Sequence, residues 1–276
     1  MKNTLNTFIF FTLLLLSYIY ILTNINYITK QTINTLIILV NNVIPILLPT
    51  LILSNLLINS NLPYLINKYF HINPIYILSI ITGSPTNASI LSNYNNITKL
   101  LSLTNYPSLL FIYNYLTKIY NNKLSILLIL LNILSNIIIY YIIKPNKLTF
   151  TYNKQPFVTS LTNSIKQTTN TLLIIITSTI LYSILPTSLI QNKYLKTLLL
   201  SITEISSSLH NLAHINIPLN IKLLFTCITI STTGLCIQTQ ILSITNNINI
   251  KEYIKNRLLH LVIYLILTYI TIILLK

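Results

Sequence analysis

The sequence predicts an all-α, polytopic membrane protein with two inverted repeats. Hydrophobic residues make up 53% of its 276 residues and charged residues 7%, more apolar surface than a soluble core could hide. Apolar runs such as 8–23 and 124–143 approach the roughly 20 residues that an α-helix needs to cross a bilayer. Only two glycines occur, so the backbone has few places where it can break.

The individual helices follow from windows of about 20 apolar residues. The full-length spans are expected near residues 7–24, 33–58, 100–118, 124–143, 168–190, 219–244 and 258–275. The first run could pass for a signal peptide, but no small-residue cleavage site follows it. We therefore expect an uncleaved first span.

Two further segments are apolar but interrupted. Residues 64–98 contain Gly83 and Pro85, and residues 193–215 contain Glu204, three successive serines and two histidines. Irregular backbone at membrane depth is tolerated only where protein or a water-filled cavity surrounds it. Each segment is therefore expected to form a broken or re-entrant helical hairpin.

The two halves of the chain resemble each other. Ile33–Ser60 and Ile165–Ile190 each have a polar start, a long Ile/Leu run and a proline near the far end. Each is followed by an interrupted segment and then by a span with its own defect, at Pro107 in one half and at Gly234 in the other. Secondary transporters often have such inverted repeats and bind substrate between discontinuous helices.

The expected organisation is a first transmembrane helix with a linker, a first repeat, a cytoplasmic connecting loop, a second repeat, and a loop with the last transmembrane helix. These parts are residues 1–32, 33–143, 144–166, 167–245 and 246–276.

The formal net charge of +15 comes from 17 basic residues and two acids. The basic residues lie singly between apolar runs, which argues against a nucleic-acid-binding face and favours anionic lipid head groups as partners. The abundance of Ile, Asn, Lys, Tyr and Leu is typical of a genome poor in G and C. By the positive-inside rule, Lys144–Lys166 and Asn246–Arg257 should face the cytoplasm and Asn121–Lys123 the outside.

The run from Thr82 to Ala88 predicts a helix start. Gly83 permits a positive φ, Ser84 is a good N-cap and Pro85 suits the first helical position. At membrane depth, such a helix N-terminus would favour an anionic or electron-rich ligand group. The alternative is a tight turn at the membrane surface that binds no ligand.

Pro107 predicts a second break. It cannot donate to the carbonyl one turn earlier, so Thr104, Asn105 and nearby carbonyls become available as ligands. The alternative is a simple proline kink.

Glu204 is the only acid within a hydrophobic segment. An intramembrane carboxylate suggests an ion ligand, a proton carrier or a hydrogen-bond acceptor, and the alternative is a solvated residue at the interface. His210 and His214 share a helix face but lack a further ligand, so no metal site is expected. No G-x-S-x-G, H-E-x-x-H or P-loop motif occurs, and we expect neither an enzyme nor a cofactor.

Four segments, read in order, resemble motifs of the YlbJ family of sporulation integral membrane proteins. They are TGSPTNA at Thr82–Ala88, LTNYPSLLFI at Leu103–Ile112, EIS at Glu204–Ser206 and TGLCIQTQ at Thr233–Gln240. That family is placed in the nucleoside-recognition (Gate) superfamily, with concentrative nucleoside transporters and the membrane part of ferrous-iron transport protein B. The chain departs from the family pattern at Asn87, Thr233 and Ser207, where glycine is usual, and at Gln238, where histidine is usual.

The resemblance implies a multi-pass cell-membrane protein of a spore-forming member of the Bacillota, with the outer forespore membrane as one candidate location. It implies a transporter or channel-like component for a small solute, with nucleoside-like molecules as one candidate, needed for spore envelope or cortex maturation. The alternative is a non-transporting morphogenetic protein that recruits other spore-envelope membrane proteins. The expected substrate-binding residues are Gly83, Ser84, Pro85, Asn87, Thr104, Asn105, Pro107, Thr203, Glu204, Ser206, Gly234, Gln238 and Gln240.

Overall fold

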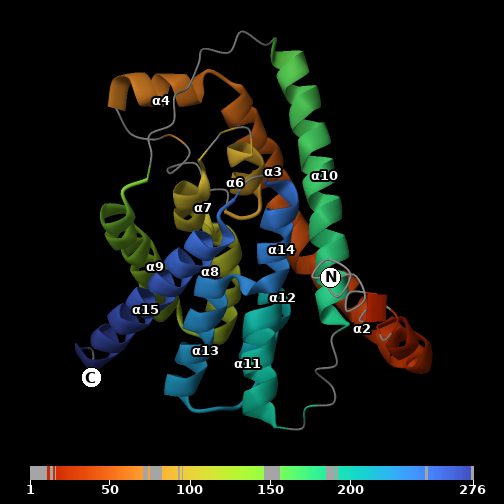
Figure 1. Cartoon of the computed structure of the whole chain (residues 1–276). Helices are drawn as coiled ribbons and strands as arrows, with labels where there is room; N and C mark the ends of the chain where they lie inside the picture. Colours follow the sequence, from red (N-terminus) through yellow and green to blue (C-terminus); the bar gives the residue numbers. More distant parts are fainter. Residues whose placement is uncertain are drawn as a thin grey trace, which may run out of the picture.

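The structure is a computed structural model. It describes residues 11–12, 15, 17–70, 74, 83–92, 94, 96–145, 156–184, 190, 192–245 and 248–274. Within these ranges every regular element is a helix, so the all-α prediction is confirmed for the described part of the chain (Figure 1). Residues 7–10, 13–14 and 16 of the first expected span, residues 71–73 and 75–82 before Gly83, and residues 146–155 of the connecting loop lie outside the described residues.

The helices are α2 (Ile25–Ile38), the π-helical turn η1 (Leu39–Val43), α3 (Ile44–Asn59), α4 (Leu62–Phe70), α6 (Thr86–Leu91), α7 (Thr98–Thr104), α8 (Leu109–Ile119), α9 (Asn122–Ile143), α10 (Phe157–Ser183), α11 (Lys193–Thr203), α12 (Ile205–His214), α13 (Leu219–Thr232), α14 (Gly234–Ile244) and α15 (Ile250–Leu274).

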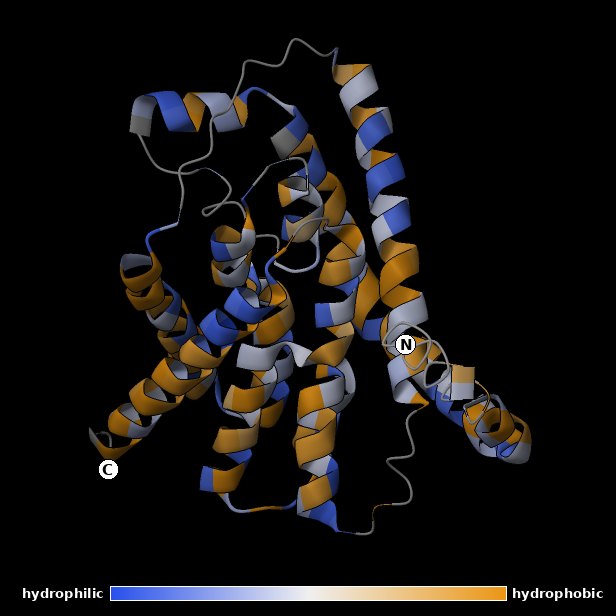
Figure 2. Cartoon of the chain, viewed as in Figure 1, coloured by the Kyte–Doolittle hydropathy of each residue, from blue (hydrophilic) through white to orange (hydrophobic). Residues whose placement is uncertain are grey.

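Four helical stretches among the described residues are long and apolar enough to cross a membrane. Their mean hydropathies are 2.4, 2.5, 1.4 and 1.7 for Ile25–Leu57, Asn122–Ile143, Leu219–Ile244 and Ile250–Ile273. Many of their large apolar side chains are exposed, and apolar residues, drawn in orange, recur along these stretches (Figure 2). An exposed apolar surface of this extent indicates a membrane protein. The helix α10 has a polar first half, which Figure 2 shows in blue and white, and is not one of the four.

The helices α2, η1 and α3 form one uninterrupted helical stretch. We expected a linker through residue 32, but the helix already includes Ile25. The residues from 25 to 32 are partly polar but include neither glycine nor proline, so nothing in them ends a helix. The stretch changes to π-helical geometry at Leu39–Val43, just before Pro45, which has no N–H to donate to the preceding turn.

Two expected spans are each divided into two helices. The span near 100–118 consists of α7 and α8, separated by Asn105–Ser108. The span near 219–244 consists of α13 and α14, which join at Thr233 and Gly234 with φ values of +59° and +76°. Both divisions lie at the defects that the sequence indicated.

The interrupted segment 193–215 forms a pair of helices. Glu204 is both the C-cap of α11 and the N-cap of α12, and its extended backbone reverses the chain between them. Hydrogen bonds between Ser201 and Ser208 and between Asn211 and Thr197 hold α11 and α12 side by side. In Figure 1, α11 lies in the lower part of the molecule, whereas α6 and α7 lie in the upper part.

Polar side chains join the C-terminal end of α3 to the first half of α10. Asn55 Nδ2 donates to Thr168 Oγ1 at 3.1 Å, and Asn59 Nδ2 donates to Ser164 Oγ at 3.2 Å. Small residues and interhelical hydrogen bonds are the usual means of helix association where lipid removes the hydrophobic driving force. The two long helices therefore form a stable wall beside the centre of the molecule.

Candidate functional site

Gly83 lies where the turn before α6 contacts the break between α7 and α8. Its φ is +70°, so the predicted positive φ is confirmed. A Cβ atom on Gly83 would lie 2.2 Å from the backbone nitrogen of Ser108, far inside van der Waals contact. The neighbouring Ser84 N–H donates to the Tyr106 carbonyl at 2.8 Å. Glycine is therefore required here both for conformation and for space.

Ser84 is not the N-cap of α6, contrary to the sequence prediction. The N-cap position belongs to Pro85, and no side chain caps the helix. The Ser84 hydroxyl instead lies 2.5 Å from Asn105 Oδ1 and 3.2 Å from Asn87 Oδ1. The Ser84 hydroxyl bonds to Asn105, which is distant in sequence, and so does not cap α6. The helix is only six residues long, and the N–H of Ala88 is already bonded within the turn.

Gly234 makes the corresponding contact in the second half. A Cβ atom there would lie 3.0 Å from the Thr203 carbonyl oxygen and 3.2 Å from Glu204 Cα. The break between α13 and α14 thus packs directly on the turn between α11 and α12. In each half, one of the two glycines lets a turn and a helix break meet backbone to backbone.

Glu204 lies at this turn with 3% of its surface exposed. Its Oε1 accepts from Ser206 N–H at 2.9 Å and its Oε2 from Ser207 N–H at 2.5 Å. The described residues give it no cationic partner, so its charge is balanced by the N-terminal end of α12. The alternative of a solvated interfacial residue does not fit this burial.

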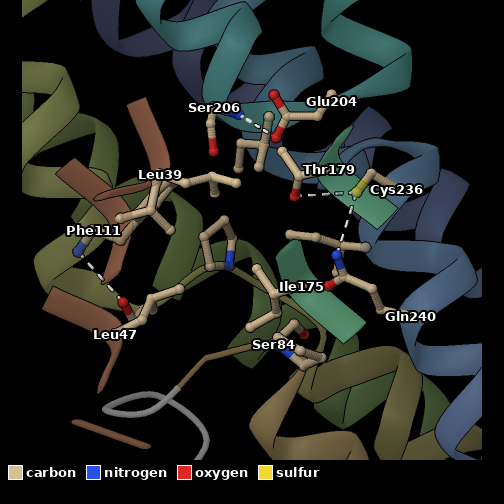
Figure 3. A pocket seen from close by; sticks show the side chains of 16 residues that line it. Leu39, Leu47, Ser84, Phe111, Ile175, Thr179, Glu204, Ser206, Cys236 and Gln240 are labelled. Carbon is tan, nitrogen blue, oxygen red and sulfur yellow. Dashed lines mark hydrogen bonds between the residues drawn. The ribbon is translucent and has the colours of Figure 1, made fainter. Parts of the chain in front are cut away.

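A pocket lies between these turns and breaks (Figure 3). Figure 3 shows Glu204 and Ser84 at opposite ends of it. Its volume is about 30 Å³, enough for a water molecule or a small ion. Its lining residues are Leu39, Val43, Leu47, Ser84, Pro85, Pro107, Ser108, Phe111, Ile175, Thr179, Glu204, Ile205, Ser206, Cys236, Ile237 and Gln240.

The structure brings together about half of the expected site residues in this pocket. Those lining it are Ser84, Pro85, Pro107, Glu204, Ser206 and Gln240. The expected residues that are not among its lining are Gly83, Asn87, Thr104, Asn105, Thr203, Gly234 and Gln238.

The expected residues outside the lining hold the turns and breaks in place. Asn87 Nδ2 donates to the Thr104 carbonyl, across the contact between α6 and α7. The Thr203 hydroxyl donates to the Leu200 carbonyl of its own helix at 3.4 Å. Their contacts are structural in this conformation.

A chain of side chains connects the two breaks. Asn105 Nδ2 donates to the Tyr253 hydroxyl, which donates to Gln238 Oε1 at 2.5 Å. Gln238 Nε2 then donates to the Thr232 carbonyl at 2.7 Å. The hydroxyl of Tyr253 thus links Asn105 to Gln238. Tyr253 belongs to α15, and the sequence did not indicate it.

Gln240 contributes an unpaired acceptor to the pocket. Its Nε2 donates to Ser178 Oγ at 2.6 Å and lies 3.3 Å from Cys236 Sγ. Its Oε1 is buried and has no hydrogen-bond partner. A buried polar atom without a partner is costly and uncommon in native proteins. This oxygen therefore suits the hydrogen-bond donor of a ligand.

Two parts of the pocket were missed from the sequence. Leu39 and Val43 come from the π-helical turn η1, and Ile175 and Thr179 come from α10. The proline at 45 could have indicated the first part, because a π-helical turn often accompanies a local defect near a functional site. Ile175 and Thr179 lie in the more apolar second half of α10, which contains neither glycine nor proline.

Arg257 was expected just before the last span, near residues 258–275, and the structure corrects that boundary. The helix α15 already begins at Ile250, and Arg257 lies inside it with 7% of its surface exposed. Its hydrogen-bond partners are backbone carbonyls of α7 and α13. These helices are distant in sequence, so a count of charges along the chain could not reveal them.

The described residues contain no group of three or more His, Cys, Asp or Glu side chains that could hold a metal ion. The rings of His210 and His214 lie 4.7 Å apart on α12, as their spacing predicts, but they form only a pair. Both cysteines are buried free thiols.

No family model matches this chain, and neither a curated protein nor a solved structure matches it.

Proposed function

We propose that this chain is a multi-pass membrane protein that carries a small solute across the membrane. The observation that supports this most directly is one pocket that is lined by both turns, by the first helix break and by the helix α14 that follows the second break. Discontinuous helices that meet around a central site are the usual substrate-binding arrangement of secondary transporters. The four ranges that converge come from distant parts of the chain, so their meeting is not a local accident.

We further propose that the two halves are inverted repeats. Each has the same order of parts: a long helix, a turn, a broken helix and another long helix. The turn before α6 and the turn between α11 and α12 approach the centre from opposite sides (Figure 1). Each turn packs on the break of its own half through a glycine. In this proposal both turns are tips of re-entrant hairpins.

Two acceptors define the chemistry of the solute. The Glu204 carboxylate carries a negative charge, and Gln240 Oε1 has no donor. A solute with N–H or O–H groups would donate to both acceptors. Alternatively, a cation would bind the Glu204 carboxylate while a small solute donates to Gln240 Oε1. In this proposal Glu204 binds the coupling cation or proton, or accepts a hydrogen bond from the solute, and Gln240 orients the solute.

The pocket must widen to admit a nucleoside. Sites for drug-sized ligands have volumes of about 300 to 1,000 Å³, whereas this pocket has about 30 Å³. In the proposal the structure is a contracted state of the transport cycle. The small volume also favours the second candidate, a morphogenetic membrane protein that keeps the architecture without transport.

A role in spore envelope or cortex maturation, at the outer forespore membrane, rests on the motif resemblance alone. Within that proposal the partners are membrane lipids, the solute and other spore-envelope membrane proteins.

A ligand screen on the purified protein separates the two candidates. Thermal unfolding in detergent would be followed with nucleosides, amino acids and cell-wall precursors. Transport predicts that at least one compound raises the melting temperature of the wild type by roughly 5 °C at saturating concentration. The Gln240→Leu variant, which removes the unpaired acceptor, should lose that response.

Gln238→Leu is the matched control, because the same change is made outside the pocket. It should lower the melting temperature but still respond to the compound. A ligand that stabilises all three proteins equally would place binding elsewhere. If no compound in the three classes binds, the scaffold is the better proposal.

A further inference from the structure

Arg257 is the only arginine in the chain. It is buried beside the C-terminal ends of α7 and α13, the first segments of the two broken helices. Its Nη1 donates to the Ser102 carbonyl at 3.0 Å, and its Nη2 donates to the Ser231 carbonyl. Ser102 is in the last turn of α7, and Ser231 is in the last turn of α13. One guanidinium group therefore joins the first segments of both broken helices to α15.

The two carbonyls need an external donor. The last carbonyls of a helix have no following turn to donate to them, and a helix C-terminus has a partial negative charge of roughly half an electron. Two such ends near one point present an electronegative site between the breaks. Arg257 is the charged group that donates to both carbonyls.

The neighbours of Arg257 support this site from the same face of α15. Asn256 Nδ2 donates to Ser102 Oγ at 3.0 Å. The imidazole of His260 lies 2.7 Å from Ser231 Oγ through Nδ1 and 2.8 Å from Ser135 Oγ through Nε2. The side chains of both serines that contact Arg257 through their carbonyls are thus also fixed by α15.

We propose that Arg257 is a tethered cation that occupies a cation site formed by the C-terminal ends of α7 and α13. Half-helix C-terminal ends and unwound carbonyls are where proteins with discontinuous helices bind dissolved coupling cations. Here the covalently attached guanidinium fills such a site permanently. Arginine suits this place better than lysine, because its planar fork can donate to two carbonyls at once.

A shared tether couples the motion of three helices, whatever the solute. The first segments of both broken helices are attached to α15, so α7, α13 and α15 move together. The site also needs no dissolved monovalent cation. This inference concerns how the breaks are held, and a negative ligand screen would leave it standing.

Chemical rescue tests the tethered cation. Arg257→Ala should lower the melting temperature of the full chain in detergent by about 5 to 10 °C, because two charge-assisted hydrogen bonds are lost. Guanidinium chloride in the millimolar range, well below denaturing concentrations, should restore part of that loss relative to choline chloride at equal ionic strength. Sodium chloride should restore less, because Na⁺ lacks the two-donor geometry.

The controls are the wild type and Lys255→Ala, which changes an exposed basic residue on the same helix. Neither should gain stability from millimolar guanidinium. In case Arg257→Ala does not fold, Arg257→Lys and Arg257→Met provide a second comparison. Lysine keeps the charge and methionine removes it at similar length, so the lysine variant should be the more stable one.

Two outcomes would overturn the proposal. One is a loss of stability in Arg257→Ala that no cation restores, because lost packing alone would explain it. The other is a methionine variant at least as stable as the lysine variant, because a cation would then not be needed at this place.

Discussion

At the residue scale, the Glu204 carboxylate has two roles that a substitution can separate. As a cap, it uses both oxygens to accept backbone N–H groups of α12. As a lining residue, it brings the negative charge to the pocket. Glutamine keeps one acceptor oxygen but loses the second oxygen and the charge.

Glu204→Gln should lower the free energy of unfolding by about 0.5 to 2 kcal/mol, because half of the cap is lost. Glu252→Gln, at the only other acid, should change it by less than about 0.5 kcal/mol. Thermal unfolding of both variants in detergent is the measurement. If Glu204→Gln were as stable as Glu252→Gln, the cap formed by Glu204 would contribute nothing to stability.

Function gives a second measure of the same residue. If Glu204 binds a cation or shuttles a proton, both Gln and Ala should abolish the ligand response found in the screen. If it only accepts a hydrogen bond from the solute, Gln should retain part of that response. Full response in both variants would remove Glu204 from the site.

The two glycines should differ in their tolerance of alanine. Both have positive φ, which costs a non-glycine residue roughly 1 kcal/mol. At Gly83 the new Cβ would also meet the Ser108 backbone nitrogen at 2.2 Å, whereas the contacts at Gly234 begin at 3.0 Å. Gly83→Ala should therefore be the more damaging change, and Gly83→Val should impair the protein further.

The yield of monomeric protein and its melting temperature test this order. A Gly83→Ala protein as stable as the Gly234→Ala protein would contradict it, and would mean that the turn and the break can separate cheaply.

The residues found from the sequence were those whose rarity or geometry sets them apart. Gly83, Pro107 and Glu204 each interrupt an apolar run, and the structure places all three at or beside the pocket. Ser84 was assigned a wrong local role because local rules do not include Asn105, which is 21 residues away. Gln240 was expected at the site, but its unpaired oxygen required coordinates.

At the element scale, the π-helical turn η1 sets which side chains of the first long helix reach the pocket. A π-helical turn has one residue more than an α-helical turn of the same rise. It therefore fixes the rotation of α2 relative to α3. Leu39 is 1% exposed and lines the pocket because of that rotation.

Deleting Asn41, which is exposed in this turn, should convert η1 to regular α-helix. One residue is about 100° of helix rotation, so Leu39 would leave the pocket and its buried side chain would lose its contacts. We expect unchanged helix content by circular dichroism and a loss of about 2 to 4 kcal/mol in stability. Asn41→Ala, which keeps the length, should be close to the wild type. A deletion variant as stable as that control would show that the register is not fixed.

Helix boundaries were predictable where glycine or proline marks them and were missed where only polarity suggested them. The break at Thr233 and Gly234 and the break before Pro107 both lie where the sequence placed defects. The beginnings of α2 and α10 extend into polar residues that the sequence assigned to loops. Polar residues without a helix breaker can continue a helix, so hydropathy alone does not locate its end.

At the scale of the whole molecule, the sidedness of the loops is the next measurable property. Asn121 lies between α8 and α9, and Asn216 lies between α12 and α13, so inverted repeats place both on one side of the membrane. Lys251, at the start of α15, should lie on the other side. All three residues are exposed.

Single cysteines at these positions, in a background that lacks Cys227 and Cys236, should be labelled by an impermeant reagent in that pattern. The positive-inside rule predicts that Lys251 is on the cytoplasmic side. Labelling of Lys251→Cys and Asn216→Cys from the same side would contradict the inverted repeats. A cysteine at the buried residue Ser231, which should stay unlabelled, is the control for nonspecific labelling.

The two glycines and the one arginine of this chain share a property that their scarcity makes visible. Gly83 lies at a turn and Gly234 at a helix break, whereas Arg257 lies within α15 and donates to the ends of α7 and α13. For each of the three, the structure gives a reason why a commoner residue would not fit. The glycines leave room for a close backbone contact, and the arginine supplies two donors from one planar group.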